Sequence, residues 1–217
     1  MLRFFALLFL VGCAASDSST PVVPEQTAVG NLRAASENET TAYFAAGCFW
    51  CVEAIYESVE GVTEAVSGYA GGMESNPSYE QVGSGKTGHA ETVMVIYNPS
   101  VVSYEMLLEV YYGMHNPTTV NGQHPDYGPQ YRSIIFYTNE NEQRSAFKAR
   151  DMAQRLYDSP VATEIVPFEK FWPAEDYHQD YEKLHPENSY VQAVSIPRLN
   201  RFKTKFPHLL KQASASK

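Results

Sequence analysis

The chain has 217 residues and a formal net charge of -9, from 25 acidic and 16 basic residues, with three cysteines. This length is enough for one domain with extensions, and such a domain can bury most of its apolar surface. No stripe of Lys and Arg is present, so nucleic acid is excluded as a main partner, because phosphate binding needs clustered cations. Three cysteines are also too few for a small fold held together by disulfides.

Residues 1–13 combine one positive residue, Arg3, with an apolar run that ends in Leu-Val-Gly-Cys. This pattern is typical of a secretory signal and is too short to cross a bilayer. Its end resembles the lipobox of bacterial lipoproteins, in which the cysteine is acylated after cleavage before it. We therefore expect an exported protein of the periplasm or cell envelope, lipid-anchored to the membrane through Cys13. Ordinary cleavage near Ala15, which would release a soluble exported protein, is the alternative.

Residues 14–40 are mainly Ser, Thr, Pro, Glu, Asn and Ala, with little large apolar content. Such a segment cannot bury enough surface to offset its ordering entropy, so we expect a disordered tether. Residues 41–210 have a globular composition and form the predicted domain, and residues 211–217 are a short tail.

Strands alternate with helices in the predicted domain. Gly61 ends the first helix, Ser103 caps the second, and Asn139 with Glu142 forms a capping box at the start of the third. The predicted strands are 41–46, 62–69, 91–97, 133–138 and 163–166; the predicted helices are 49–58, 103–114 and 139–157, with a polar helix within 168–184; the predicted loops are 71–90 and 115–131. This order indicates an α+β protein, a two-layer α/β sandwich around a mixed sheet.

A pair of cysteines lies at the junction between the first predicted strand and the first predicted helix. Cys48 follows Gly47, and Cys51 comes one helical turn later. Cys-x-x-Cys is found in zinc sites and in redox sites. A structural zinc site needs four ligands, and the chain offers no second cysteine pair. His178 and His185 lack a partner and are expected to be solvated or to cap helices. We therefore expect no metal, and the pair indicates redox chemistry.

The sequence around Cys48 does little to activate its thiol. An ordinary cysteine is only about 3% thiolate at neutral pH. A helix N-terminus stabilises a negative charge by roughly 0.3–1 kcal/mol, less than the 1.36 kcal/mol that corresponds to one pKa unit. Between Thr41 and Gly85 there is no Lys, Arg or His. Either a cation distant in sequence helps Cys48, or an acid makes its substrate more electrophilic.

Several ordered motifs point to one family. They are Gly-Cys-Phe-Trp at 47–50 with Glu53, Gly-Tyr-Ala-Gly-Gly at 68–72, Asn-Pro-Ser-Tyr at 76–79, Thr-Gly-His-Ala-Glu at 87–91 and Gln-Tyr-Arg-Ser at 130–133. Over residues 41–210 the chain resembles the A-type peptide methionine sulfoxide reductases. The resemblance implies a ferredoxin-like sandwich that reduces methionine S-sulfoxide, free or in oxidised proteins, to methionine. It implies no cofactor, and a thioredoxin-like protein or a dithiol as reductant. We also expect a monomer.

The resemblance implies a role for each matching residue. Cys48 would attack the sulfoxide sulfur, Glu91 would protonate the oxygen, and Tyr79 and Tyr131 would donate hydrogen bonds to that oxygen. A carboxyl with this role needs a raised pKa. The methyl group of the substrate is apolar, which suits aromatic side chains. By the same resemblance, the substrate pocket includes Phe49, Trp50 and Asp126.

The resemblance also implies that Cys48 becomes a sulfenic acid, which a second thiol can convert to a disulfide. Many family members carry that thiol near the C-terminus, but here Val191 stands in its place. We therefore predict a Cys48–Cys51 disulfide, and direct reduction of the sulfenic acid by an external thiol is the rival. Two other functions remain open, a thioredoxin-like thiol-disulfide oxidoreductase and a tethered binding lipoprotein with a vestigial site.

Overall fold

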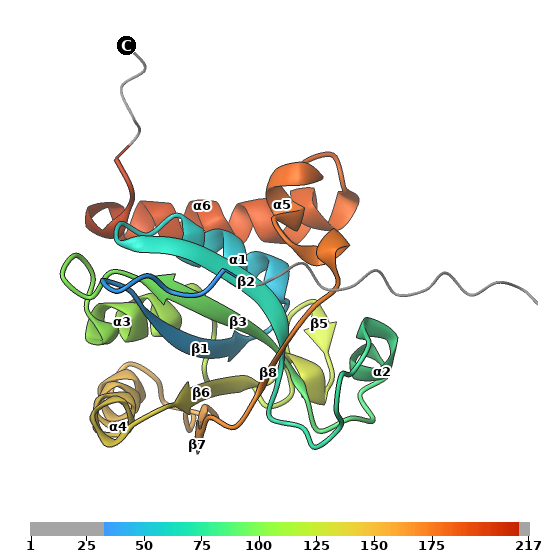
Figure 1. Cartoon of the computed structure of the whole chain (residues 1–217), viewed down its shortest axis with the longest axis horizontal. Helices are drawn as coiled ribbons and strands as arrows, with labels where there is room; N and C mark the ends of the chain where they lie inside the picture. Colours follow the sequence, from blue (N-terminus) through green and yellow to red (C-terminus); the bar gives the residue numbers. More distant parts are fainter. Residues whose placement is uncertain (1–32, 213–217) are drawn as a thin grey trace, which may run out of the picture.

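The computed structural model describes residues 33–212, in which helices pack around one six-stranded sheet (Figure 1). The strands follow the order β7-β6-β1-β3-β2-β8, and a separate two-stranded hairpin joins β4 to β5. The strands are β1 (Thr40–Ala46), β2 (Val62–Ala70), β3 (Ala90–Tyr97), β4 (Gly122–Gln123), β5 (Asp126–Tyr127), β6 (Ser133–Tyr137), β7 (Glu164–Pro167) and β8 (Phe171–Pro173). The α-helices are α1 (Phe49–Glu57), α2 (Tyr79–Gly83), α3 (Tyr104–Met114), α4 (Glu140–Gln154), α5 (Tyr181–Leu184) and α6 (Ile196–Lys205).

The sheet is mixed, as predicted. β1, β3, β2 and β8 pair antiparallel, as do β1 and β6, whereas β6 and β7 pair parallel. The central strand β3 is buried along its whole length, which fits its run of apolar residues. The α+β class expected from the sequence is therefore confirmed.

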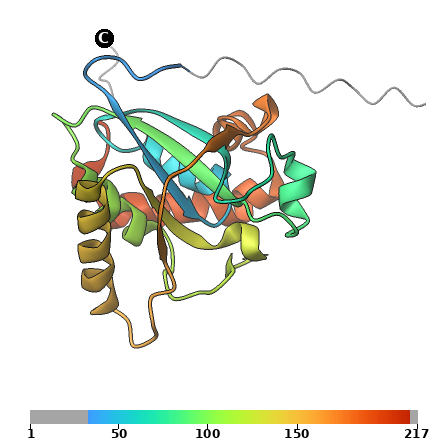
Figure 2. The same ribbon diagram turned by 60° about the horizontal axis from the view of Figure 1, so that its bottom comes forward.

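The larger hydrophobic core lies between one face of the sheet and helices α1, α3 and α6. Phe44 of β1 stacks on Tyr56 of α1, with ring centroids 5.2 Å apart, and packs against Tyr111 of α3 at 5.6 Å. On the opposite face, Tyr43 stacks on Phe168 at 3.8 Å. Figure 2 shows the segment that carries β7 and β8 crossing this face. The site described below belongs to the helical side, at the end of β1.

Most predicted elements are confirmed to within a few residues, and most differences concern short segments. The exception is the ten-residue helix α6, which was not predicted. The predicted loop 71–90 contains the short helix α2, and the predicted loop 115–131 contains the β4–β5 hairpin. The segment 168–184 begins with the edge strand β8, and its helix is limited to the four residues of α5. Elements of two to five residues are too short for their hydrophobic period to be read from sequence.

The caps of the two later helices are as predicted, with one exception. The Ser103 side chain accepts a hydrogen bond from the backbone of Met106, and Asn139 accepts one from the backbone of Glu142. The predicted capping box is wrong. It would require the Glu142 carboxylate to accept from the backbone N–H of Asn139, but this carboxylate accepts from the N–H of Thr138, one residue before the cap. Helix α4 ends at Gln154, three residues before the predicted end at 157.

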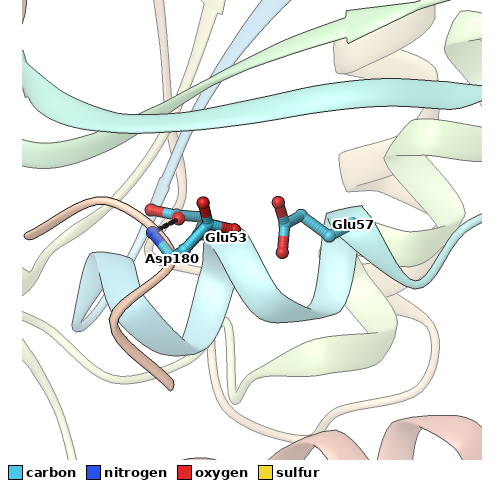
Figure 3. Close-up of side chains that lie close together, drawn as sticks. All are labelled: Glu53, Glu57 and Asp180. Carbon is cyan, nitrogen blue, oxygen red and sulfur yellow. Dashed lines mark hydrogen bonds between the residues drawn. The ribbon is translucent and has the colours of Figure 1, made fainter. Parts of the chain in front are cut away.

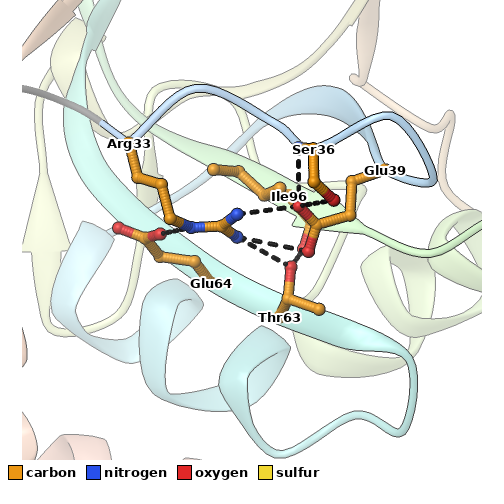
Figure 4. Close-up of polar contacts among 6 residues, drawn as sticks. All are labelled: Arg33, Ser36, Glu39, Thr63, Glu64 and Ile96. Carbon is orange, nitrogen blue, oxygen red and sulfur yellow. Dashed lines mark hydrogen bonds and ion pairs between the residues drawn. The ribbon is translucent and has the colours of Figure 1, made fainter.

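Residues before β1 also contact the sheet (Figure 4). The Arg33 guanidinium pairs with Glu39 at 2.7 Å and with Glu64 of β2 at 2.9 Å, and it donates to the Thr63 hydroxyl at 3.2 Å. Ala35 packs against the core on the face that Phe168 covers. These contacts involve residues 33–39, the last part of the segment predicted as a tether. Residues 14–32 lie outside the described residues, so the tether itself stays a prediction.

The signal segment 1–13, with Cys13, lies outside the described residues, as do residues 14–32 and 213–217. Within residues 33–212, no helix is long and apolar enough to cross a membrane.

Candidate active site

The turn from β1 into α1 places Cys48 at the N-cap, directly before the first residue of the helix. Gly47 has φ of +90°, a conformation that residues with a Cβ rarely adopt, and a Cβ there would lie 2.8 Å from Cβ of Gln123. Cys48 is the N-cap of α1 and is 6% exposed. The glycine is therefore required by both conformation and space, and it fixes the position of the thiol.

Glu91 lies directly beside this helix start. It faces Tyr69 across the β2–β3 pair and is 2% exposed. Its carboxyl accepts a hydrogen bond of 3.0 Å from the backbone N–H of Phe49, the residue after Cys48. Burial raises the pKa of Glu91 to about 8, against the smaller opposite effect of that bond. The carboxyl is thus an acid at neutral pH, next to the thiol.

Tyr79 and Tyr131 come from two separate segments, and both lie near Glu91 and Cys48. Tyr79 begins α2, where its backbone N–H donates to Glu175 at 3.0 Å, and Tyr131 ends the turn η1 (Pro129–Tyr131). Burial, and then the nearby charge of Glu91, raises the pKa of Tyr79 to about 12. The same two causes raise the pKa of Tyr131. Both phenols therefore stay protonated and can donate hydrogen bonds beside Glu91.

Two aromatic side chains form the wall next to Cys48. Phe49 is buried, whereas Trp50 is half-buried and stacks on Tyr181 with centroids 3.8 Å apart. The Trp50 indole N–H donates to Nδ1 of His178 at 3.1 Å. The prediction that His178 and His185 are solvated or cap helices holds for His185, which lies at the C-cap of α5 with 44% of its side chain exposed. For His178 solvation is wrong, because it is 1% exposed among these rings. His178 therefore holds the orientation of Trp50, a role that its spacing in the sequence did not indicate.

Cys51 and Cys48 are both free thiols in the structure, and they are joined by a hydrogen bond between their side chains. The Tyr190 hydroxyl lies 3.9 Å from Sγ of Cys51 and donates to the Asp126 carboxylate at 2.6 Å. It also contacts the Cys48 thiol. Sequence reasoning missed Tyr190. Its position next to Val191, where many family members carry a cysteine, was the available signal.

The two thiols have opposite electrostatic surroundings. Burial raises the pKa of Cys48, and the neighbouring Cys51 and Glu91 raise it further. The hydrogen bond with Cys48 lowers the pKa of Cys51 to about 7 despite burial, and the positive charge of Arg198 acts in the same direction. A cation distant in sequence is therefore present, but it acts on Cys51. For Cys48, the structure favours the other possibility, an acid that activates the substrate.

Three carboxyl groups lie close together (Figure 3), those of Glu53 and Glu57 on α1 and that of Asp180 just before α5. Their oxygens lie within 4.8 Å of one another. The Glu53 carboxyl accepts from the Ser67 hydroxyl of β2 and from the backbone N–H of Asp180. Burial raises the pKa of Glu53 to about 8 and that of Glu57 to about 7. Protonation of Glu53 and Glu57 reduces the repulsion within this cluster. The contacts of Glu53 connect α1 to β2 and to the segment before α5.

The comparisons with known proteins agree with this geometry. The family model described as "Peptide methionine sulfoxide reductase" matches residues 40–210. The peptide methionine sulfoxide reductase MsrA of Polynucleobacter asymbioticus is 49% identical over 169 residues, which cover 76% of this chain and 87% of that protein.

Solved structures are similar too. Mxr1 from Saccharomyces cerevisiae in reduced form has a TM-score of 0.69 and 32% identity, over 73% of this chain and 92% of that one. Methionine sulfoxide reductase A of Corynebacterium diphtheriae has a TM-score of 0.65 and 31% identity, over 70% of this chain and 78% of that one. The chain therefore belongs to the peptide methionine sulfoxide reductase family, and it reduces methionine sulfoxide with thiol chemistry.

Proposed function

We propose that Cys48 attacks the sulfur of methionine S-sulfoxide while Glu91 protonates the sulfoxide oxygen. The observation that carries this assignment is the 3.0 Å bond from the Phe49 N–H to the Glu91 carboxyl, which holds the acid one residue from the thiol. Sulfoxides are poor electrophiles until the oxygen is hydrogen-bonded or protonated, and a carboxyl with a pKa near 8 can supply that proton at neutral pH. The hydroxyls of Tyr79 and Tyr131 donate to the same oxygen.

The reaction transfers one oxygen from the substrate to the enzyme. As the sulfur of Cys48 bonds to the substrate sulfur, the sulfoxide oxygen takes the proton of Glu91, and the proton of the Cys48 thiol returns to the Glu91 carboxylate. The hydroxyl then passes to the sulfur of Cys48 while the S–O and S–S bonds to the substrate sulfur break. Methionine leaves with its sulfur reduced by two electrons, and Cys48 is left as a sulfenic acid. Cys51 attacks this sulfur, a Cys48–Cys51 disulfide forms, and the oxygen departs as water.

Substrate selection follows from the shape of the site. The rings of Phe49 and Trp50 supply an apolar wall for the methyl group, and Asp126 with Tyr190 forms the polar wall. Trp50, Tyr79 and Tyr131 are only half-buried, so the site opens to solvent and admits a methionine side chain on a peptide as well as the free amino acid.

The disulfide must be reduced before the next turnover, and we propose a thioredoxin-like protein as the partner. Yeast Mxr1, which is similar to this chain, has been solved in complex with Trx2. The open side of the site is compatible with access by another protein.

Single-turnover kinetics of the wild type, Cys51→Ser and Cys48→Ser test this sequence of steps. We expect Cys51→Ser to release one methionine per enzyme and then stall with thioredoxin, whereas Cys48→Ser releases none. Undiminished recycling of Cys51→Ser by thioredoxin would show that an external thiol reduces the sulfenic acid directly. Methionine S- and R-sulfoxide are assayed separately, and turnover of the R form would contradict the stereochemical assignment.

We also propose that the chain is exported and anchored through an acylated Cys13, on the basis of its signal-like segment. Labelling of cells with radioactive palmitate tests this: wild type is expected to carry label in the membrane fraction, and Cys13→Ser is not. Label-free wild type in the soluble fraction would exclude the anchor. A monomer is proposed for the reductase, and light scattering of the purified protein checks it.

A further inference from the structure

A second pocket lies on the other side of the Gly47 turn, with a volume of about 410 Å³. One wall is α6 and the other is the segment 113–124, and Gln123 separates the pocket from the Cys48 turn. Three cationic side chains line it, Arg198, Arg201 and Lys205. No Asp or Glu is among the described residues that line it, although the whole chain carries a net charge of -9.

Arg198 is the most buried of the three cations that line the pocket. Its side chain is 7% exposed, and its Nη1 atom has no hydrogen-bond partner within the described part of the chain. The same atom lies 3.5 Å from the position that a Cβ on Gly47 would take. Asp126 is close enough to interact electrostatically with Arg198, and its carboxylate accepts from Tyr190 at 2.6 Å, but it makes no hydrogen bond to Nη1 of Arg198. A buried guanidinium with an unsatisfied N–H is costly unless a counter-charge completes it.

We propose that this pocket binds a small tetrahedral oxyanion, of the phosphate or sulfate type, between Arg198, Arg201 and Lys205. A guanidinium presents parallel N–H groups that match two oxygens of such an anion, and the free Nη1 of Arg198 points to that use. Arg201 and Lys205 are exposed at the mouth, where their charge attracts an anion from solution. The volume is several times that of a water molecule, which occupies about 30 Å³ in the liquid.

Arg198 also links this pocket to the thiol pair. Its positive charge favours the thiolate of Cys51, alongside the contacts that Cys51 makes with Cys48 and Tyr190. An anion on Arg198 would offset that charge, so anion binding and ionisation of Cys51 oppose each other, and each weakens the other by the same factor. This coupling bears on turnover only through the resolving role proposed for Cys51, whereas the binding site itself does not depend on that role.

Calorimetric titration of the reduced protein with inorganic phosphate, sulfate and acetate, at constant ionic strength with chloride, tests the site. We expect saturable binding of phosphate and sulfate. The double variant Arg201→Ala/Lys205→Ala should bind them about tenfold more weakly or worse, because charge-assisted bonds are lost. Lys203→Ala is the matched control, since it removes a cation from the exposed side of the same helix outside the pocket, and it should keep the wild-type affinity.

The absence of saturable binding would overturn the proposal, as would an equal loss of affinity in Lys203→Ala, which would show unspecific screening. Acetate bound as tightly as phosphate would overturn the tetrahedral assignment. Arg198→Met should abolish binding of phosphate and sulfate. If that variant does not fold, the affinity of the double variant Arg201→Ala/Lys205→Ala still tests the site. For the coupling, saturating phosphate should slow alkylation of the thiols in wild type but not in the double variant. An unchanged rate with phosphate bound would overturn the coupling alone.

Discussion

The backbone N–H of Phe49 donates a hydrogen bond of 3.0 Å to the carboxyl of Glu91. This bond joins the start of α1 to β3, two elements that lie 42 positions apart in sequence. It holds an acid and a thiol next to each other before any substrate binds. A site that is arranged in advance avoids the cost of ordering these groups during the reaction.

Replacement of Glu91 by Gln is expected to lower kcat for sulfoxide reduction by about 10²- to 10⁴-fold, the usual contribution of a general acid. The amide oxygen can still accept from the Phe49 N–H, so the helix start should keep its position. The measurement is methionine release with dithiothreitol as reductant, and Glu80→Gln, on the exposed face of α2, is the control. Reduction of insulin disulfides, if the protein shows any, should survive in Glu91→Gln. Parallel loss of both activities would favour the thioredoxin-like alternative.

The raised pKa of Glu91 gives a pH dependence with a definite sign. The folded carboxyl holds its proton up to about pH 8, against an ordinary value of 4.5. Its contribution to stability is therefore complete below pH 4.5 and is lost as pH rises through 8. Glu91→Gln should thus be more stable than wild type above pH 8, by about 5 kcal/mol, with the difference shrinking toward pH 4.

Urea unfolding of both proteins between pH 4 and pH 9 measures this difference. Activity of the wild type should fall over the same range as pH rises through 8, because the acid form is lost. A stability difference that does not change with pH would mean that Glu91 is not buried in its protonated form.

The Tyr190 hydroxyl contacts both thiols and the Asp126 carboxylate. The hydroxyl has a single proton, which it can turn from Asp126 to a thiolate when a thiol ionises. Loss of this hydroxyl in Tyr190→Phe should therefore raise the pKa of both thiols, since a hydrogen bond to a thiolate stabilises it. We expect alkylation by iodoacetamide at pH 7 to slow about three- to tenfold, the effect of a bond worth roughly 0.5–1.5 kcal/mol. Tyr177→Phe, an exposed phenol, is the control. Equal rates for Tyr190→Phe and wild type would exclude Tyr190 from the thiol environment.

Substitution of Gly47 by Ala should destabilise the fold by about 1–3 kcal/mol, because its φ of +90° and the nearby Gln123 both oppose a Cβ. Gly83→Ala is the matched control. It lies in the last turn of α2 with nothing within 4 Å of a new Cβ, and it should be neutral or stabilising by up to about 1 kcal/mol. Thermal unfolding of the two variants gives the comparison, and similar melting temperatures would contradict the requirement for glycine at 47.

Much of the fold could be predicted from sequence because the signals that start and end its helices and strands lie within a few residues of one another. The caps at Ser103 and Asn139 hydrogen-bond to residues two or three positions away, so the information lies within one turn. The apolar run of β3 and the glycine at 47 are signals of the same local kind. The motifs also identified the family, because several short patterns in a fixed order are specific even where each alone is weak.

Only the tertiary structure decided what surrounds those residues. Glu91 would be expected at the surface from its residue type, and its raised pKa exists because β3 lies in the centre of the sheet and buries it. Tyr190 and Arg198 lie more than 130 positions after Cys48 in sequence, and they reach the thiol pair only because the C-terminal segment folds back onto α1. Burial and long-range proximity are properties of the whole packed chain, and no local pattern encodes them.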